Sequence, residues 1–225
     1  MSNSQQTIKD NSAARVSAKP QHNIRVVKIG GSLLDLPDLS TRLSSWLNRQ
    51  APMPTVWIVG GGIAVDALRE NICESLADQE SMHWAAINIM SSNVKSVWQF
   101  QFPDWILVNE LEVLKRALLE TSRKQSPQAS NILFDCSHWL QSNSYLPRTW
   151  DVTSDSIAVA LAGAIKACEV VLLKSVEVDQ GKTIASLVDS GIVDAYFETA
   201  LENLRKKANG QRRLDIRFEN ARAFY

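Results

Sequence analysis

The sequence predicts an α/β fold with helices on both faces of an open, mainly parallel sheet. Short apolar runs, such as 24–29 and 55–59, alternate with longer segments whose apolar residues have helical spacing. Both of these runs end directly in glycines. Strands that are apolar throughout are buried on both faces, and sheets of such strands are mostly parallel. The 225 residues are 45% hydrophobic, so the chain can bury the core of one domain.

The first half of the chain contains three predicted strands and four predicted helices. Leu39, Leu43 and Trp46, for example, recur at the spacing of one helix face. In chain order, we expect strands at 24–29, 55–59 and 105–108, and helices at 36–48, 63–77, 80–100 and 111–119.

The second half continues the alternation, with polar loops at 121–130 and 141–151. We expect strands at 131–135, at 170–173 and near 214–218, a helix over 153–167 and two further helical stretches. No internal repeat or linker interrupts this pattern. We therefore predict one domain over 23–225, preceded by a disordered tail at 1–22.

The composition argues against several classes of partner. Lys and Arg total 24, as do Asp and Glu, so the chain carries no overall charge that attracts nucleic acid. The longest apolar run, 157–165, is about half as long as a membrane span. Cys73, Cys136 and Cys168 form no CxxC pair, so they predict neither disulfides nor a metal site. We expect a cytoplasmic protein that acts on a small molecule, without nucleic acid or membrane.

Glycines and lysines gather where the predicted strands end. Ligands of such sheets bind beyond the carboxyl ends of the strands. Three segments fall at that edge, namely 30–31, 60–62 and 174–175. Their convergence predicts one ligand site.

The first of these segments follows Lys28, in the run Lys28-Ile29-Gly30-Gly31-Ser32. A lysine near the end of a buried strand is costly unless an anion meets it. The two glycines let the backbone approach a ligand and present amide groups to it. These features suit a transferred phosphoryl group, whose charge Lys28 would neutralise. The alternative is a tight turn with an exposed lysine, and the motif is not a Walker loop.

Three further motifs have a functional and a purely structural interpretation. Gly60-Gly61-Gly62 can bind an anion or allow close packing of strand and helix. Thr153-Ser154-Asp155-Ser156 can supply an aspartate that orients lysines or simply cap a helix. Lys174 can reach a nucleotide phosphate or lie in solvent. The same choice between ligand contact and ordinary packing or solvation applies to Asp66 and His83.

Taken in order, the segments 26–32, 59–62, 152–158 and 170–176 resemble the amino acid kinase superfamily, which includes acetylglutamate, aspartate, carbamate, uridylate and isopentenyl phosphate kinases. The resemblance covers the chain from about Ile24 to the C-terminus. It implies a three-layer αβα sandwich around an eight-stranded, mainly parallel sheet. It also implies that the N-terminal half holds the phosphoryl acceptor and the C-terminal half holds ATP.

Within the superfamily, the chain is most similar to the aminomethylfuran phosphate kinases of methanofuran biosynthesis and of tetrahydromethanopterin-linked one-carbon metabolism. Met82-His83-Trp84-Ala85-Ala86, together with 153–158 and 172–176, carries this closer resemblance. It implies a phosphate-bearing acceptor and a homo-oligomer.

The resemblance also implies roles for individual residues. Lys28 would stabilise the transferred phosphoryl group and Asp155 would organise the lysines, so both are candidate catalytic residues. ATP and Mg²⁺ are the implied cofactors, with nucleotide contacts from Gly30, Gly31, Ser32, Lys174 and Ser175. The candidate acceptor-binding residues are Gly60, Gly61, Gly62, Asp66, His83, Thr153 and Ser154.

The chain departs from the superfamily in its late segment. Many members carry Gly-Met-x-x-Lys there, whose lysine binds ATP phosphates, whereas 182–188 lacks this motif. Lys174 or Lys182 is the candidate substitute. A non-catalytic nucleotide-binding protein is therefore an alternative to a kinase. A carboxylate, met by Arg69 or Asn88, and a nucleoside monophosphate are alternative acceptors.

Overall fold

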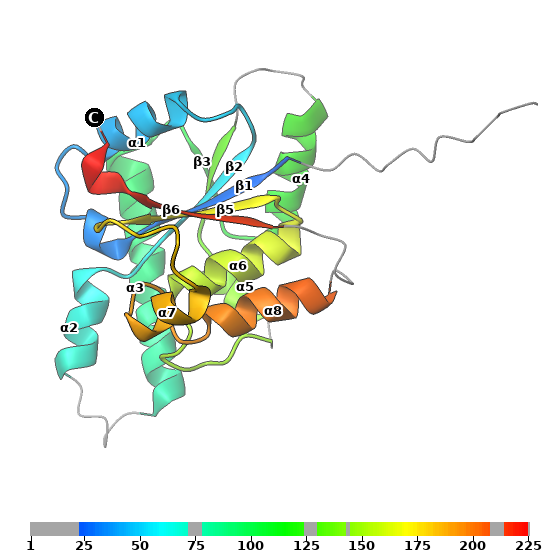
Figure 1. Cartoon of the computed structure of the whole chain (residues 1–225). Helices are drawn as coiled ribbons and strands as arrows, with labels where there is room; N and C mark the ends of the chain where they lie inside the picture. The colour runs from blue at the N-terminus through cyan, green and yellow to red at the C-terminus, as the bar shows by residue number, and fades with distance from the viewer. Residues whose placement is uncertain (1–22, 72–77, 124–129, 143–144, 208–213, 225) are drawn as a thin grey trace, which may run out of the picture.

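The computed structural model describes residues 23–71, 78–123, 130–142, 145–207 and 214–224 (Figure 1). The predicted tail at 1–22 lies outside the described residues. So do Cys73 and the end of the helix predicted over 63–77.

The described residues form one six-stranded sheet with the order β3-β4-β2-β1-β5-β6. Every pair of neighbouring strands is parallel, which confirms the predicted sheet type. The strands are β1 (Arg25–Ile29), β2 (Thr55–Val59), β3 (Ile106–Val108), β4 (Asn131–Phe134), β5 (Glu169–Lys174) and β6 (Asp215–Asn220).

The implied number of eight strands is wrong for the described part of the chain. Between β5 and α7, the segment 175–183 forms bends and a turn at Gly181 instead of a strand, although residues 175–179 alternate between polar and apolar. The segment 145–153 before α6 carries Pro147 and likewise folds as turns.

Helices cover both faces of the sheet and complete the three layers (Figure 1). One face packs on α1, on the last turns of α3 and on the C-terminal 3-10 turn η2, and the other face packs on the earlier turns of α3 and on α4 to α8. The helices are α1 (Leu39–Asn48), α2 (Ile63–Asn71), α3 (Gln79–Phe100), α4 (Leu111–Arg123), α5 (Ser137–Gln141), α6 (Ser154–Ile165), α7 (Ile184–Asp189) and α8 (Phe197–Lys207); η1 is Gly31–Leu33 and η2 is Ala221–Ala223.

Strand alternation decides which way the two key lysines point. Val26 in β1 packs into the core beneath α6, whereas Val27 and Ile29 pack beneath α1. Successive side chains of a strand alternate between faces, so Lys28 lies on the side of Val26. Lys174 lies, for the same reason, on the side of Leu172 in β5. Both lysines therefore project toward α6.

The sequence-based prediction missed one α-helix as well as the 3-10 turns η1 and η2. The short helix α5 directly follows β4, where only a strand end was expected. Cys136 is buried at its start and Cys168 is half-buried, and both are free thiols. Within the described ranges, no helix is long and apolar enough to cross a membrane.

Candidate functional site

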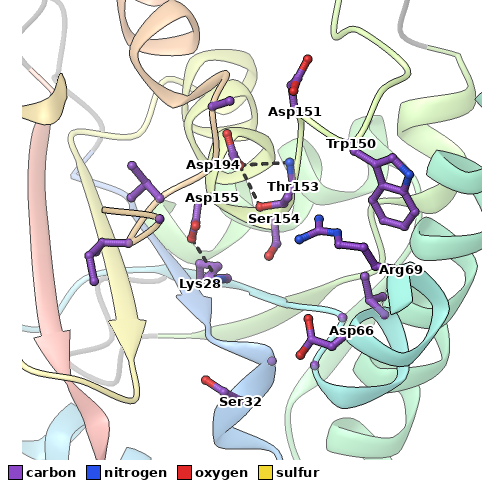
Figure 2. A pocket seen from close by; sticks show the side chains of 18 of the residues that line it. Lys28, Ser32, Asp66, Arg69, Trp150, Asp151, Thr153, Ser154, Asp155 and Asp194 are labelled. Carbon is purple, nitrogen blue, oxygen red and sulfur yellow. Dashed lines mark hydrogen bonds and ion pairs between the residues drawn. The ribbon is translucent and has the colours of Figure 1, made fainter. Parts of the chain in front are cut away.

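A pocket of about 780 Å³ opens at the carboxyl edge of the sheet (Figure 2). Its walls come from the turns after β1 and β2, from α2, from the start of α6 and from the loop 191–195. Most of the candidate site residues line this one pocket: Lys28, Gly31, Ser32, Gly61, Gly62, Asp66, Thr153, Ser154, Asp155 and Lys174.

Three other candidates lie just behind the pocket wall. The Gly30 amide donates to the Leu173 carbonyl, and the Gly60 amide donates to the Ile29 carbonyl. These two glycines therefore extend the hydrogen bonding of the sheet rather than line the pocket. Ser175 accepts a hydrogen bond of 2.9 Å from Ser32 Oγ, which joins the first turn to the end of β5.

His83 does not line the pocket. It is buried in α3, its Nδ1 lies 3.2 Å from the Thr149 carbonyl, and its ring meets Trp84 edge to face. Burial lowers the pKa of His83 below its ordinary value. The structure thus gives His83 a packing role, and its neighbour Met82 lines the pocket instead.

The centre of the pocket is a carboxylate shared by two ammonium groups. Lys28 Nζ lies 2.9 Å from Asp155 Oδ1 (Figure 2), and Lys174 Nζ lies 2.8 Å from Asp155 Oδ2. The three side chains are 7%, 11% and 6% exposed for Lys28, Lys174 and Asp155. The Lys174 contact is a hydrogen bond, whereas Lys28 faces Oδ1 as an ion pair without hydrogen-bond alignment.

This arrangement has one more positive charge than Asp155 can neutralise. Burial opposes ionisation of Asp155, but Lys28 and Lys174 outweigh it and hold the pKa of this carboxyl below its usual value. Burial and the charge of Lys28 lower the pKa of Lys174 to about 8, against the opposing pull of Asp155. The two lysines therefore leave an unbalanced charge that an anion would stabilise.

Asp194 is a pocket residue that sequence reasoning missed. Its Oδ2 accepts hydrogen bonds from the Thr153 amide at 3.0 Å, Thr153 Oγ1 at 2.8 Å and the Ser156 amide at 3.0 Å. Its Oδ1 accepts a further one from Ser156 Oγ. Burial, followed by the nearby charge of Asp155, raises the pKa of Asp194 despite these bonds. No sequence signal marks it, because it caps α6 from a loop far along the chain.

The glycine turns are packed directly against each other. A Cβ atom on Gly31 would lie 2.0 Å from the Gly62 nitrogen, and Gly62 has a positive φ of 63°. Both positions therefore require glycine. Among the described residues, the amide groups of Gly31, Ser32, Gly61 and Gly62 donate no hydrogen bond within the protein. These donors are available to a ligand.

In the outer part of the pocket, an arginine is stacked on an aromatic ring. Arg69 extends from α2, with its guanidinium carbon 4.8 Å from the centre of the Trp150 ring. Figure 2 shows this side chain reaching from α2 toward Thr153 and Ser154, with Asp66 below it. Asn88, the other residue considered for a carboxylate acceptor, is exposed on α3 and does not line the pocket.

The described residues contain no group of three or more His, Cys, Asp or Glu side chains that could hold a metal ion. Four aspartates line the pocket: lysines and hydrogen-bond donors already engage Asp155 and Asp194, and Asp66 and Asp151 belong to no such group. The pocket instead presents ammonium groups and amide donors. That chemistry suits phosphate oxygens.

No protein-family model and no curated protein sequence matches this chain. Several solved structures do resemble it. The uridylate kinase of Archaeoglobus fulgidus has a TM-score of 0.53 at 14% identity, over 87% of this chain and 99% of that one. The UMP kinase of Bacillus anthracis has a TM-score of 0.55 at 12% identity, over 91% and 89%.

An N-acetylglutamate synthase from Neisseria gonorrhoeae is also similar, with a TM-score of 0.54 and 14% identity, over 91% of this chain and 55% of that one. At these identities the likeness concerns the fold. It confirms the predicted α/β architecture, in which helices cover both faces of a mainly parallel sheet.

Proposed function

We propose that this chain is a phosphotransferase that moves the γ-phosphoryl group of ATP onto a small acceptor. The observation that carries the proposal is the buried pair of lysines on one carboxylate, placed between two turns with unused amide groups. The UMP kinases with a similar fold support the same class of reaction.

In this proposal, the chain stabilises charge rather than forming covalent bonds with the substrate. Gly31, Ser32 and Lys174 hold the nucleotide phosphates, and Gly61 and Gly62 hold the acceptor. Lys28 lies between them and neutralises charge on the phosphoryl group during an in-line displacement. Asp155 is then a positioning residue, since it fixes both ammonium groups without contacting the substrate.

Mg²⁺ would be held mainly by the phosphates of the nucleotide, because the pocket carboxylates closest to the lysines are already engaged. When bound, the ion neutralises phosphate charge. The ammonium groups of Lys28 and Lys174 supply the protein's part of that neutralisation.

For the acceptor, we propose a phosphate monoester that becomes a diphosphate. An anionic phosphate needs no general base, and the pocket-lining residues among those described include no histidine. The sequence resemblance at 82–86 favours an aminomethylfuran phosphate-like compound of one-carbon cofactor biosynthesis. The names of the similar structures favour UMP as the second candidate.

Specific observations also favour two different functions. Arg69, with its guanidinium group in the outer pocket, favours a carboxylate acceptor of the acetylglutamate type. The absence of Gly-Met-x-x-Lys at 182–188 favours a protein that binds nucleotide without turning it over.

The first test is the substitution Lys28→Ala in an assay of ATP consumption. We expect turnover to fall about 10²–10³-fold, since charge stabilisation at the transferred group is lost. Lys206→Ala on α8 is the matched control, because that lysine is exposed and remote from the pocket. Circular dichroism should show both variants folded. Unchanged turnover in Lys28→Ala would contradict the assigned role.

The acceptor is tested by supplying Mg-ATP with aminomethylfuran phosphate, UMP or N-acetylglutamate in turn. Formation of a diphosphate from one of the first two supports the proposal, and phosphorylation of N-acetylglutamate supports a carboxylate acceptor. Calorimetric binding of Mg-ATP without turnover of any acceptor would support a non-catalytic binding protein.

A further inference from the structure

Asn93 contacts the second glycine turn from outside the pocket. It lies in α3, is half-buried and is not a pocket-lining residue. Its Nδ2 group donates 2.9 Å hydrogen bonds to the carbonyls of both Gly60 and Gly61. An amide NH₂ group has two hydrogens, so it can serve both carbonyls at once.

Peptide geometry links these two carbonyls to the pocket. In a planar trans peptide, the carbonyl of one residue and the amide of the next point in opposite directions. No described peptide bond is cis. By holding the Gly60 and Gly61 carbonyls outward, Asn93 sets the direction of the Gly61 and Gly62 amides. Both glycines line the pocket, and neither amide donates to protein among the described residues.

A turn of three glycines needs such a restraint. Glycine populates more backbone conformations than any other residue, so Gly60-Gly61-Gly62 has no intrinsic preference for the orientation seen here. Gly31 restrains the turn on one side by direct backbone packing. Asn93 restrains it from α3 through two side-chain hydrogen bonds.

We propose that Asn93 is a positioning residue that aims the Gly61 and Gly62 amides at a phosphate group of the bound ligand. The inference rests on the proposed function and deepens it, because it explains how a flexible turn presents two aligned donors. The ligand class is a phosphate or diphosphate group, whose oxygens accept such hydrogen bonds strongly. Asn93 itself contacts no ligand.

The experiment follows the amide resonances of Gly61 and Gly62 in ¹⁵N-labelled full-length protein during titration with pyrophosphate. In the native protein, both resonances should shift and saturate. In Asn93→Ala, we expect the dissociation constant for pyrophosphate to rise about 3–10-fold, as for the loss of one hydrogen-bonding group. The shifts of the two amides should also shrink relative to those of Gly31.

Asn88→Ala is the control, because Asn88 is an exposed asparagine on the same helix. It should titrate like the native protein. Asn93→Asp provides a second variant of nearly equal volume, in which a carboxylate faces the two carbonyls and cannot donate. Asn93→Asp should weaken pyrophosphate binding at least as much as Asn93→Ala. It also allows the inference to be tested if Asn93→Ala does not fold.

The inference is overturned if Asn93→Ala and Asn93→Asp bind pyrophosphate as the native protein does, with unchanged glycine shifts. It is equally overturned if pyrophosphate binds the native protein without moving the Gly61 and Gly62 resonances. Turnover of Mg-ATP by the native protein is measured separately. If the native protein turns over Mg-ATP but the Asn93 variants bind pyrophosphate normally, the proposed function stands and only this inference is overturned.

Discussion

At the scale of single residues, the most informative feature is the imbalance of charge around Asp155. Burying an ionised side chain is costly, and a buried pair is stable only when each charge finds a partner. Asp155 serves Lys28 and Lys174 together, so neither lysine has a carboxylate of its own. Burial, followed by the charge of Lys28, lowers the pKa of Lys174 to about 8 although Asp155 opposes the shift.

The charge of Lys174 predicts how ligand binding depends on pH. Lys174 has a folded-state pKa of about 8, below its ordinary value, so its charge is lost as pH rises through that range. Only the charged form attracts phosphate. We therefore expect the affinity for Mg-ATP to fall between about pH 7 and 9, with proton uptake on binding near pH 8.

Calorimetry in two buffers with different ionisation enthalpies measures both quantities. Lys174→Arg keeps its charge throughout this range and should remove the fall in affinity. An affinity that stays constant from about pH 7 to 9 in the native protein would rule out this role for Lys174.

The sequence was sufficient to predict part of the site at this scale. Lys28 and Lys174 follow from motifs at strand ends, and their common direction follows from strand alternation. Asp194 and Asn93 could not be found in that way. Each acts on backbone that is far away in the chain, and only the tertiary fold brings them there.

At the scale of elements, a protein carboxylate, that of Asp194, already occupies the N-terminal end of α6. Asp194 accepts the amides of Thr153 and Ser156 at that end, although Thr153 as N-cap makes no side-chain capping bond of its own. The positive end of the helix dipole therefore faces a protein carboxylate. The unused amides of the two glycine turns become the main backbone donors for a ligand.

The two turns act as one unit because their backbones are in contact. Gly31→Ala would place a methyl group 2.0 Å from the Gly62 nitrogen and 2.4 Å from its Cα. Backbone cannot rotate away as a side chain can, so the turns must separate. We expect a loss of about 3 kcal/mol in the free energy of unfolding, measured with urea, together with loss of pyrophosphate binding.

Gly163→Ala is the control for this prediction. It lies inside α6, and its added Cβ would meet only Leu204, with Cδ1 at 3.4 Å, an ordinary contact with a flexible side chain. Since alanine favours helix over glycine, we expect it to raise stability by about 0.5–1 kcal/mol. If Gly31→Ala proved as harmless as Gly163→Ala, close packing of the turns would not be required.

The C-terminal segment secures the first turn from the opposite end of the chain. Arg222 Nη2 donates a 2.9 Å hydrogen bond to the Ser32 carbonyl. The same nitrogen forms an ion pair with Asp35, at 2.7 Å from Oδ1 and 2.8 Å from Oδ2. In Figure 1 this segment, drawn in red, lies beside α1. The last residues thus support the site without lining it.

At the scale of the whole molecule, the position of the pocket follows from the order of the strands. Within the sheet, β2, β4 and β3 lie on one side of β1 in that order, and β5 and β6 lie on its other side. Ligands of open parallel sheets bind where the strand order reverses. Lys28 lies near the end of β1 and Lys174 ends β5, so both lie at this reversal.

Most of the architecture was predictable because the apolar runs are short and end in clear breakers. The six strands were each expected within a few residues of their observed bounds. The number of strands was harder to predict. The expectation of eight strands rested on the family resemblance, whereas the apolar runs of this sequence predict six. The expected homo-oligomer stays a prediction.

The central claim is that Lys28, Lys174 and the first glycine turn together hold the phosphates of a nucleotide. A crystal structure with Mg²⁺ and a non-hydrolysable ATP analogue tests it most directly. The account predicts phosphate oxygens within hydrogen-bond distance of Lys28 Nζ, of Lys174 Nζ and of the Gly31 amide. A nucleotide bound with its phosphates elsewhere, and Lys28 facing only Asp155, would contradict it.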